Sequence, residues 1–246
     1  MSRVRADQRL VDLGLAPSRA RARALILDGK VAGISKPGQM IAAGATPELL
    51  EPDHPWVSRG GLKLVQALDH FGLPVEGLTC LDVGASTGGF TDVLLSRGAV
   101  RVFAVDVGHG QLHPRLAADD RVVSMEGVNS RDLDAAAIPE PIDACVADVS
   151  FISLEAALPA ALALCRPGAW LLALVKPQFE VGREHVGKGG IVRDEAVRDQ
   201  VPDRIGGWLE AAGWRTLGVI ASPIQGSDGN REFLIGAEKT GDEGQG

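Results

Sequence analysis

The sequence predicts an α/β protein whose main domain is a mostly parallel, doubly wound sheet. From about residue 62, short apolar strands alternate with helix-forming segments, the order expected when helices cover both faces of a parallel sheet. The first of these strands runs directly into a glycine-rich turn, as in nucleotide-binding α/β folds. The first 55 residues do not show this alternation of strands and helices, and they predict a smaller α+β module that precedes this domain.

The N-terminal module is predicted to hold two short helices followed by two short strands. Residues 5–28 have the apolar spacing of two helices, and Ser18 is placed to cap the second one. Asp28-Gly29-Lys30 predicts a turn before strands at 31–34 and 40–41. A proline-marked stretch at 47–55 ends the module.

Six apolar segments of the main domain predict strands, and the stretches between them predict helices. The strands are expected at 79–83, 101–107, 142–147, 170–175, 215–221 and 233–237. The helices include 89–97, 154–165 and 194–212, with Pro202 bending the last one. The expected boundaries are a module at 1–55, a linker at 56–61, a main domain at 62–239 and a tail at 240–246.

Net charge alone argues against a nucleic-acid partner, but its distribution argues for one. The chain of 246 residues carries −7 overall. Residues 1–36 hold eight basic and three acidic side chains, so this part carries +5 and the remainder −12. A basic module of this kind predicts contact with RNA phosphates. The residues expected to make it are Arg5, Ser18, Arg19, Arg21, Arg23 and Lys30.

Several protein classes are excluded by composition. No apolar run approaches the roughly 18 residues that cross a bilayer, and no apolar stretch of a signal peptide follows the N-terminal charges. Cys80, Cys145 and Cys165 lie in apolar surroundings without a His or second Cys at ligand spacing. We therefore expect reduced cysteines, no metal site, no membrane association and a cytoplasmic location.

The glycine-rich turn after the first strand predicts a cofactor site. It runs from Gly84 to Phe90 and has Ser86 where a dinucleotide fingerprint would place glycine. The next strand ends at Asp106, 22 residues after Gly84, where a carboxylate can bind the ribose hydroxyls of an adenosine ligand. Asp82, just before the glycines, is placed to receive an ammonium group. This pattern favours S-adenosylmethionine over NAD, the alternative being a tight turn that binds nothing.

Four polar side chains lie where a strand ends or a helix begins, the edge at which open α/β sheets bind ligands. They are Lys63, Asp148, Lys176 and Glu232. A lysine accepts a proton only in its neutral form, which a second lysine nearby and partial burial both favour. With Asp148 and Glu232 orienting the two amines, this set is suited to removing the proton of a ribose hydroxyl during methyl transfer.

Each of these four residues also has a structural interpretation. Asp148 could cap the helix at 154–165, Glu232 could be a surface charge, and Lys63 could be a solvated helix residue that points away from the apolar side. Lys176 closes a strongly apolar strand and requires a partner there. Their joint occurrence favours the catalytic interpretation.

Six stretches of the main domain resemble the TlyA (hemolysin A) family of ribosomal RNA 2′-O-methyltransferases, which is related to the FtsJ-type ribose methyltransferases. They are Ser58–Leu64, Leu81–Thr91, Asp106–Leu112, Asp148–Ser153, Val175–Glu180 and Gly187–Asp194. The N-terminal module resembles the S-four-type RNA-binding module at Leu15–Arg19 and Leu25–Val31. One departure is Ser86-Thr87, where the wider ribose methyltransferase group has Ala-Pro.

The resemblance implies a class I Rossmann-like methyltransferase domain that uses S-adenosylmethionine and acts on cytidine of ribosomal RNA within ribosomal subunits. It implies Lys63, Asp148, Lys176 and Glu232 as the catalytic set, with Lys176 as general base. The residues expected at the cofactor are Asp82, Gly84, Ser86, Gly88, Gly89, Phe90, Asp106 and Val107. Lys188, in a glycine-rich loop, is expected to touch RNA.

Two alternatives remain open at this point. Asp148-Val149-Ser150-Phe151 faintly resembles the loop of base amino-methyltransferases, although it lacks their prolines. A non-catalytic RNA-binding or ribosome-assembly factor would also use the basic module. The second family name implies membrane lysis, for which the sequence offers no spanning or amphipathic segment.

Overall fold

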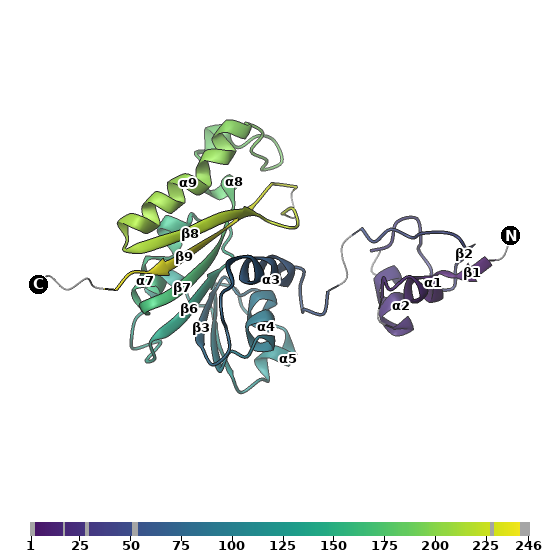
Figure 1. Cartoon of the computed structure of the whole chain (residues 1–246), viewed down its shortest axis with the longest axis horizontal. Helices are drawn as coiled ribbons and strands as arrows, with labels where there is room; N and C mark the ends of the chain where they lie inside the picture. The colour runs from purple at the N-terminus through teal and green to yellow at the C-terminus, as the bar shows by residue number, and fades with distance from the viewer. Residues whose placement is uncertain (1–2, 17, 28–29, 51–53, 227–228, 242–246) are drawn as a thin grey trace, which may run out of the picture. The chain divides into compact units, whose positions relative to one another are not determined.

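The computed structural model describes residues 3–16, 18–27, 30–50, 54–226 and 229–241. Its internal contacts divide the chain into Met1–Pro55 and Trp56–Gly246. We call these units the N-terminal module and the C-terminal domain and describe each by itself (Figure 1). The predicted turn at Asp28-Gly29, part of the proline-marked stretch and most of the tail lie outside the described residues.

The N-terminal module packs two helices against a short antiparallel ribbon. Strand β1 (Arg3–Arg5) pairs with β2 (Met40–Ala42), and the helices are α1 (Ala6–Asp12) and α2 (Arg19–Leu27). Ser18 does cap α2, because its hydroxyl accepts a hydrogen bond from the Arg21 amide at 3.2 Å. The apolar sides of both helices meet in a small core that consists of Ala6, Leu10, Ala16, Ala22, Leu25, Ile26, Val31 and Ile34.

One prediction for this module was wrong, and one strand was not predicted. The expected strand at 31–34 does not form: Val31 makes a single bridge to Leu49, and a turn with Gly33 in the left-handed region follows at once. Strand β1 was not predicted, because a segment of three residues with two arginines has no visible alternation of apolar and polar side chains.

The C-terminal domain is built on the mostly parallel sheet that the sequence predicts. Its strands lie in the order β5-β4-β3-β6-β7-β9-β8. Their bounds are β3 Thr79–Val83, β4 Arg101–Asp106, β5 Val122–Glu126, β6 Ile142–Ala147, β7 Cys165–Val175, β8 Trp214–Ala221 and β9 Phe233–Lys239. The five strands from β5 to β7 are parallel, whereas β9 runs antiparallel to both β7 and β8. The fold class is therefore confirmed.

Helices cover both faces of this sheet, as a doubly wound fold requires (Figure 1). Successive strand residues alternate between two cores: Leu81 and Val83 pack into one, and Cys80 into the other. The first core includes side chains from α6 (Leu154–Ala157), α7 (Pro159–Ala163) and α9 (Glu195–Ala211). The second includes side chains from α3 (Gly60–Phe71), α4 (Gly89–Ser96) and α5 (Pro114–Ala117).

Two predicted elements of this domain need correction, and one strand was not predicted. The helix expected at 154–165 is two helices, because the chain breaks at Leu158 and restarts with Pro159 as the first residue of α7. Strand β7 begins at Cys165 rather than 170. Strand β5 was missed altogether. Helix α9 accommodates Pro202 in its interior, and the Asp194 carboxylate caps it by accepting from the Ala196 amide at 3.0 Å.

Candidate active site

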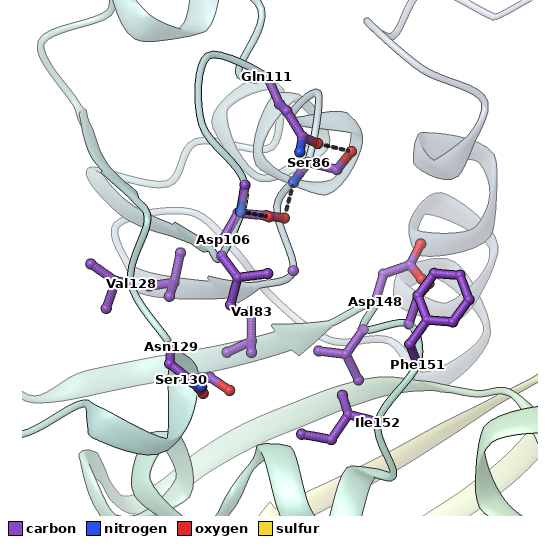
Figure 2. A pocket seen from close by; sticks show the side chains of 16 residues that line it. Val83, Ser86, Asp106, Gln111, Val128, Asn129, Ser130, Asp148, Phe151 and Ile152 are labelled. Atoms are coloured by element: carbon purple, nitrogen blue, oxygen red, sulfur yellow. Dashed lines mark hydrogen bonds between the residues drawn. The ribbon is translucent and has the colours of Figure 1, made fainter.

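The carboxyl ends of the parallel strands carry the predicted functional residues. Strand β3 leads into Gly84, β4 ends at Asp106, β6 is followed by Asp148 and β7 by Lys176. Two adjoining cavities of about 580 and 360 Å³ lie at the carboxyl ends of these strands. Both are lined by Gly84, Ser86, Asp148 and Ser150. Figure 2 shows the larger one, with Asp106 and Ser86 on one side and Asp148 and Phe151 on the other.

Lys176 is held at the smaller cavity by two oxygen atoms. Its Nζ lies 2.6 Å from Asp148 Oδ1 and donates to Ser150 Oγ at 2.8 Å. Both partners belong to the loop that follows β6, the strand next to β7 in the sheet. Because β6 pairs with β7, Asp148 after β6 lies next to Lys176 after β7.

Lys63 forms a second, more deeply buried ion pair. Its Nζ donates to Glu232 Oε2 at 2.6 Å, and the exposed fractions of the two side chains are 9% and 3%. Lys63 is therefore neither solvated nor free, although the apolar side of α3 was expected to turn it away from the interior. Glu232 directly precedes Phe233, which pairs with Val175 at the end of β7, so the register of β7 and β9 brings Glu232 to this edge.

The four residues of the predicted catalytic set thus meet in one place. Lys63, Asp148 and Lys176 all line the smaller cavity, and Glu232 is bonded to Lys63. The arrangement consists of two lysine–carboxylate pairs rather than a cluster in which every group touches every other. Removing either carboxylate would leave a buried or half-buried ammonium without its counter-charge.

The glycine-rich turn needs glycine at two points for different reasons. A Cβ on Gly84 would lie 2.6 Å from the Asp148 carbonyl oxygen, so this glycine allows the two strand ends to approach each other. A Cβ on Gly88 would lie 2.3 Å from Leu116 Cδ1, and the backbone there has φ of 94°. Ser86 has φ of 48° without being glycine, a conformation compensated by hydrogen bonds to its amide and its hydroxyl.

Asp106 is placed where an adenosine-binding carboxylate is expected. It lines the larger cavity, and its two oxygens accept from the Ser86 amide at 2.8 Å and the Gly108 amide at 2.7 Å (Figure 2). The neighbouring Val107 also lines this cavity and is 68% exposed. Gly89 and Phe90 line the smaller cavity.

Asp82 does not reach either cavity. Its side chain is fully buried, and the Thr91 hydroxyl donates to Oδ2 at 2.6 Å. Burial, together with the charges of Asp148 and Asp106, raises the pKa of Asp82 to about 7. The structure therefore places this carboxyl beneath the glycine-rich turn, and not in position to receive an ammonium group from the cavity.

Several lining residues were not predicted. Ser58 and Arg59 line the smaller cavity, while Gln111, Asn129 and Ser130 line the larger one. Asn129 and Ser130 follow β5, so the missed strand concealed them. The loop after β6 adds Phe151, which is 91% exposed, has φ of 65° and contacts the Phe179 ring at a centroid distance of 5.0 Å.

The predicted RNA contacts of the N-terminal module include two arginines that share one carboxylate. Arg5 and Arg19 approach Asp7 Oδ2 at 2.9 and 3.1 Å, and Asp7 is fully buried. These bonds lower the pKa of Asp7 to about 2, chiefly through Arg5. Arg21 donates to the His54 carbonyl at 3.4 Å, Arg23 is exposed and Lys30 is half-buried.

Lys188 lies in the C-terminal domain, in a loop that is fastened to the segment before Glu232. The side chain of Asn230 donates to the Gly190 carbonyl at 2.8 Å and accepts from the Val192 amide at 3.2 Å. Lys188 itself is exposed.

The described residues contain neither a candidate metal cluster nor a membrane-spanning helix. Within the ranges given above, no group of three or more His, Cys, Asp or Glu side chains could hold a metal ion. Every helix in those ranges is too short or too polar to traverse a bilayer.

Comparison with known proteins identifies the family. The FtsJ-like methyltransferase family matches residues 56–239. The 16S/23S rRNA (cytidine-2'-O)-methyltransferase TlyA of Mycobacterium tuberculosis is 46% identical over 95% of this chain and 89% of its own length. The chain belongs to the TlyA family of FtsJ-like methyltransferases. Hemolysin A of Brachyspira hyodysenteriae, another relative, is 38% identical over 94% of this chain and 98% of its own length.

Solved structures agree with this TlyA-family assignment. A Streptococcus thermophilus protein with a provisional hemolysin name superimposes with a TM-score of 0.77 at 42% identity, covering 98% of this chain and 90% of its own. Aeropyrum pernix fibrillarin, solved with S-adenosyl-L-methionine, has a TM-score of 0.51 at 18% identity, covers 71% of this chain and 74% of its own, and shows the shared fold alone. The Rossmann-like methyltransferase fold of this TlyA-family chain is therefore established.

Proposed function

We propose that this protein transfers a methyl group from S-adenosylmethionine to the ribose 2′-hydroxyl of a cytidine in ribosomal RNA, within ribosomal subunits. The observation that carries the proposal is the pair of lysine–carboxylate contacts at the smaller cavity, which adjoins the cavity lined by Asp106 and shares Gly84 and Ser86 of the glycine-rich turn with it. It is supported by the 46% identical relative named for this reaction.

The larger cavity fits an adenosine-bearing cofactor. It offers the Asp106 carboxylate for ribose hydroxyls, the backbone of Gly84 and Ser86 for close approach, and apolar walls at Val105 and Val128. Bound there, S-adenosylmethionine supplies an electrophilic methyl group. The buried Asp82 is left out of this assignment because it faces Thr91.

Lys176, in its neutral amine form, is the residue proposed to take the proton of the 2′-hydroxyl. Asp148 Oδ1 and Ser150 Oγ hold its Nζ at the cavity shared with the cofactor turn, which limits the geometries from which the reaction can start. Lys63, held by Glu232, adds a positive charge at the same cavity and favours the developing oxyanion.

The N-terminal module is proposed to dock on the RNA. The shared carboxylate of Asp7 holds the guanidinium groups of Arg5 and Arg19 near each other, with a surplus of one positive charge for phosphate. Lys188 is proposed to add a contact from the C-terminal domain.

The first prediction tests Lys176. Purified protein should transfer labelled methyl to ribosomal subunits, whereas Lys176→Ala and Lys176→Arg should each lose at least about a hundredfold in kcat. Arginine keeps the positive charge beside Asp148 but does not become neutral, so it separates proton transfer from charge pairing. Thermal unfolding of each variant checks that the fold persists.

The outcome distinguishes the alternatives. Wild-type turnover in Lys176→Arg would refute the role of Lys176 as base. A product in which the methyl does not protect the adjoining phosphodiester from alkali would indicate base methylation, because only a 2′-O-methyl blocks attack by that oxygen. A protein that binds RNA but not S-adenosylmethionine would be the non-catalytic factor.

A further inference from the structure

Glu126 is a carboxylate at the cavity edge that the reaction above does not use. It ends strand β5, and its oxygens accept three successive backbone amides: Gly110 at 3.0 Å, Gln111 at 2.6 Å and Leu112 at 3.0 Å. These bonds lower the pKa of Glu126, so it is ionised at neutral pH. One charged side chain thus fixes the loop of residues 107–112, which connects β4 to α5.

The 107–112 loop is in turn bonded to the glycine-rich turn. Gln111 Oε1 accepts from the Ser86 hydroxyl at 3.2 Å (Figure 2), and just beyond the loop the His113 amide donates to the Thr87 carbonyl at 3.2 Å. The Leu112 side chain approaches Gly88 so closely that a Cβ there would lie 2.8 Å from Leu112 Cδ1. Three successive residues of the turn therefore rest on this segment.

Asp106 and Glu126 contact different parts of the site: Asp106 lines the larger cavity, and Glu126 binds the backbone of the 107–112 loop. Asp106 and Glu126 are paired residues in the register of β4 and β5, so they end neighbouring strands at the same level. Asp106 lines the larger cavity, as do Val107, Gly108 and Gln111 of the loop, but Glu126 is not among its lining residues. Glu126 touches the loop that forms the wall, and not the space where a ligand would bind.

Gly127, the residue after Glu126, also packs closely against the 107–112 loop. A Cβ on Gly127 would lie 2.2 Å from the His109 ring, and the Gly127 amide donates to the Gly108 carbonyl at 2.9 Å. The residue after Glu126 thus holds the first half of the loop, while Glu126 holds the second half.

We propose that Glu126 is a positioning residue for cofactor binding, which sets the 107–112 loop as the wall of the S-adenosylmethionine site and, through it, supports the turn at Ser86–Gly88. This inference rests on the proposed function. Without the Glu126 carboxylate, the amides of Gly110, Gln111 and Leu112 lose their shared acceptor. The 107–112 loop must then become ordered each time the cofactor binds, which costs conformational entropy. The cost therefore falls on cofactor affinity and not on the methyl-transfer step.

The test compares Glu126→Ala, Glu126→Gln and wild type by calorimetry with S-adenosylmethionine and by steady-state methylation of ribosomal subunits. We expect the Kd of the cofactor to rise at least about tenfold in Glu126→Ala. In Glu126→Gln one oxygen can still accept two amides, so a rise of about threefold is expected. The kcat at saturating cofactor and the KM for the subunits should stay within about twofold of wild type.

Glu76→Gln is the matched control. Glu76 is an exposed residue before the amino-terminal end of β3, whereas the cavities lie at the carboxyl ends of the parallel strands. A Kd unchanged in Glu126→Ala, or a fall in kcat at constant Kd, would overturn the positioning role. If Glu126→Ala does not fold, Glu126→Gln decides by the same Kd and kcat criteria. A wild-type protein that binds no S-adenosylmethionine would instead overturn the proposed function, and this inference with it.

Discussion

Asp82 is buried against Thr91 and lies outside the lining of both cavities, although it was expected to contact the cofactor. Its place two residues before Gly84 suggested contact with the cofactor. Strand alternation decides otherwise, because Leu81 and Val83 pack into one core and Asp82 must face the other, where Thr91 of α4 lies. Period-two alternation was visible in the sequence and would have corrected the assignment.

The pairing of Lys63 with Glu232 is the opposite case. Both residues were singled out as candidates, yet their burial and contact could not be deduced. The two side chains are 169 positions apart and meet only because β9 inserts between β7 and β8. Local patterns report on neighbours within one element, and this contact joins two elements through the order of the sheet.

Asp82 leads to a prediction about stability and pH. Its pKa of about 7 in the folded state lies above the ordinary value of 3.8, so the folded protein retains a proton that the unfolded chain releases. This contribution to the free energy of unfolding is complete below about pH 4 and is lost as the pH rises through about 7. We expect Asp82→Asn to remove that decline, which thermal unfolding between about pH 5 and pH 8 would detect.

The control for this measurement is Asp69→Asn, since Asp69 is an exposed residue of α3 that pairs with Arg97 on the surface. It should leave the pH dependence of the melting temperature as in wild type. An Asp82→Asn protein with the wild-type pH dependence would show that the carboxyl is already ionised throughout this range.

Strands β3, β4, β6, β7, β8 and β9 were all predicted, and the four inner parallel strands, β3, β4, β6 and β7, were predicted for the same reason. The parallel strands are buried on both faces and appear as continuous apolar runs, which are easy to recognise. Strand β5 lies at the edge of the sheet, and none of its residues is fully buried. Its Ser124 and Glu126 obscure the apolar pattern, so the strand and the adjoining Asn129 and Ser130 were missed together.

The turn between β3 and α4 gives a prediction for one element. Gly88→Ala should lower the free energy of unfolding by about 2–4 kcal/mol, because a left-handed backbone and a clash with Leu116 add together. Gly72→Ala is the matched control: Gly72 ends α3 with φ of 65°, and its Cβ would meet nothing within 4 Å. The control should lose only about 1 kcal/mol.

Denaturant unfolding of the two variants measures the difference directly. Equal losses would mean that Leu116 can move aside without cost, and that the turn is not packed as tightly as its contacts with α5 indicate.

Charge is the property that needs the whole molecule to be understood. A net charge of −7 describes an acidic protein, but residues 1–36 carry +5 against −12 for the remainder. The structure adds that part of this charge is committed internally, since Arg5 and Arg19 both contact the buried Asp7. Composition by segment could predict the partner, while the geometry that prepares these arginines required the fold of the module.

The corresponding prediction concerns RNA affinity and salt. For the full-length protein, the logarithm of the association constant should fall linearly with the logarithm of salt concentration. Arg19→Gln should reduce that slope by about one, whereas Asp7→Asn should not reduce it, because both arginines keep their charge. Filter binding to ribosomal RNA over a salt series provides the measurement.

Arg121→Gln serves as control. Arg121 pairs with Asp119 just before the amino-terminal end of β5, whereas the cavities lie at the carboxyl ends of the strands. It should alter neither affinity nor slope. Binding that does not respond to salt in wild type would remove the N-terminal module from RNA recognition.

The antiparallel insertion of β9 also has a consequence for how the protein is made. Glu232 is synthesised 169 residues after Lys63, which belongs to the first helix of its domain. A nascent chain that ends before residue 232 has to bury an ammonium without its carboxylate, and its sheet lacks the strand that joins β7 to β8. Frameshifts or stop codons before codon 232 should therefore abolish the fold and the active site together, so that no truncated, partly active methyltransferase accumulates.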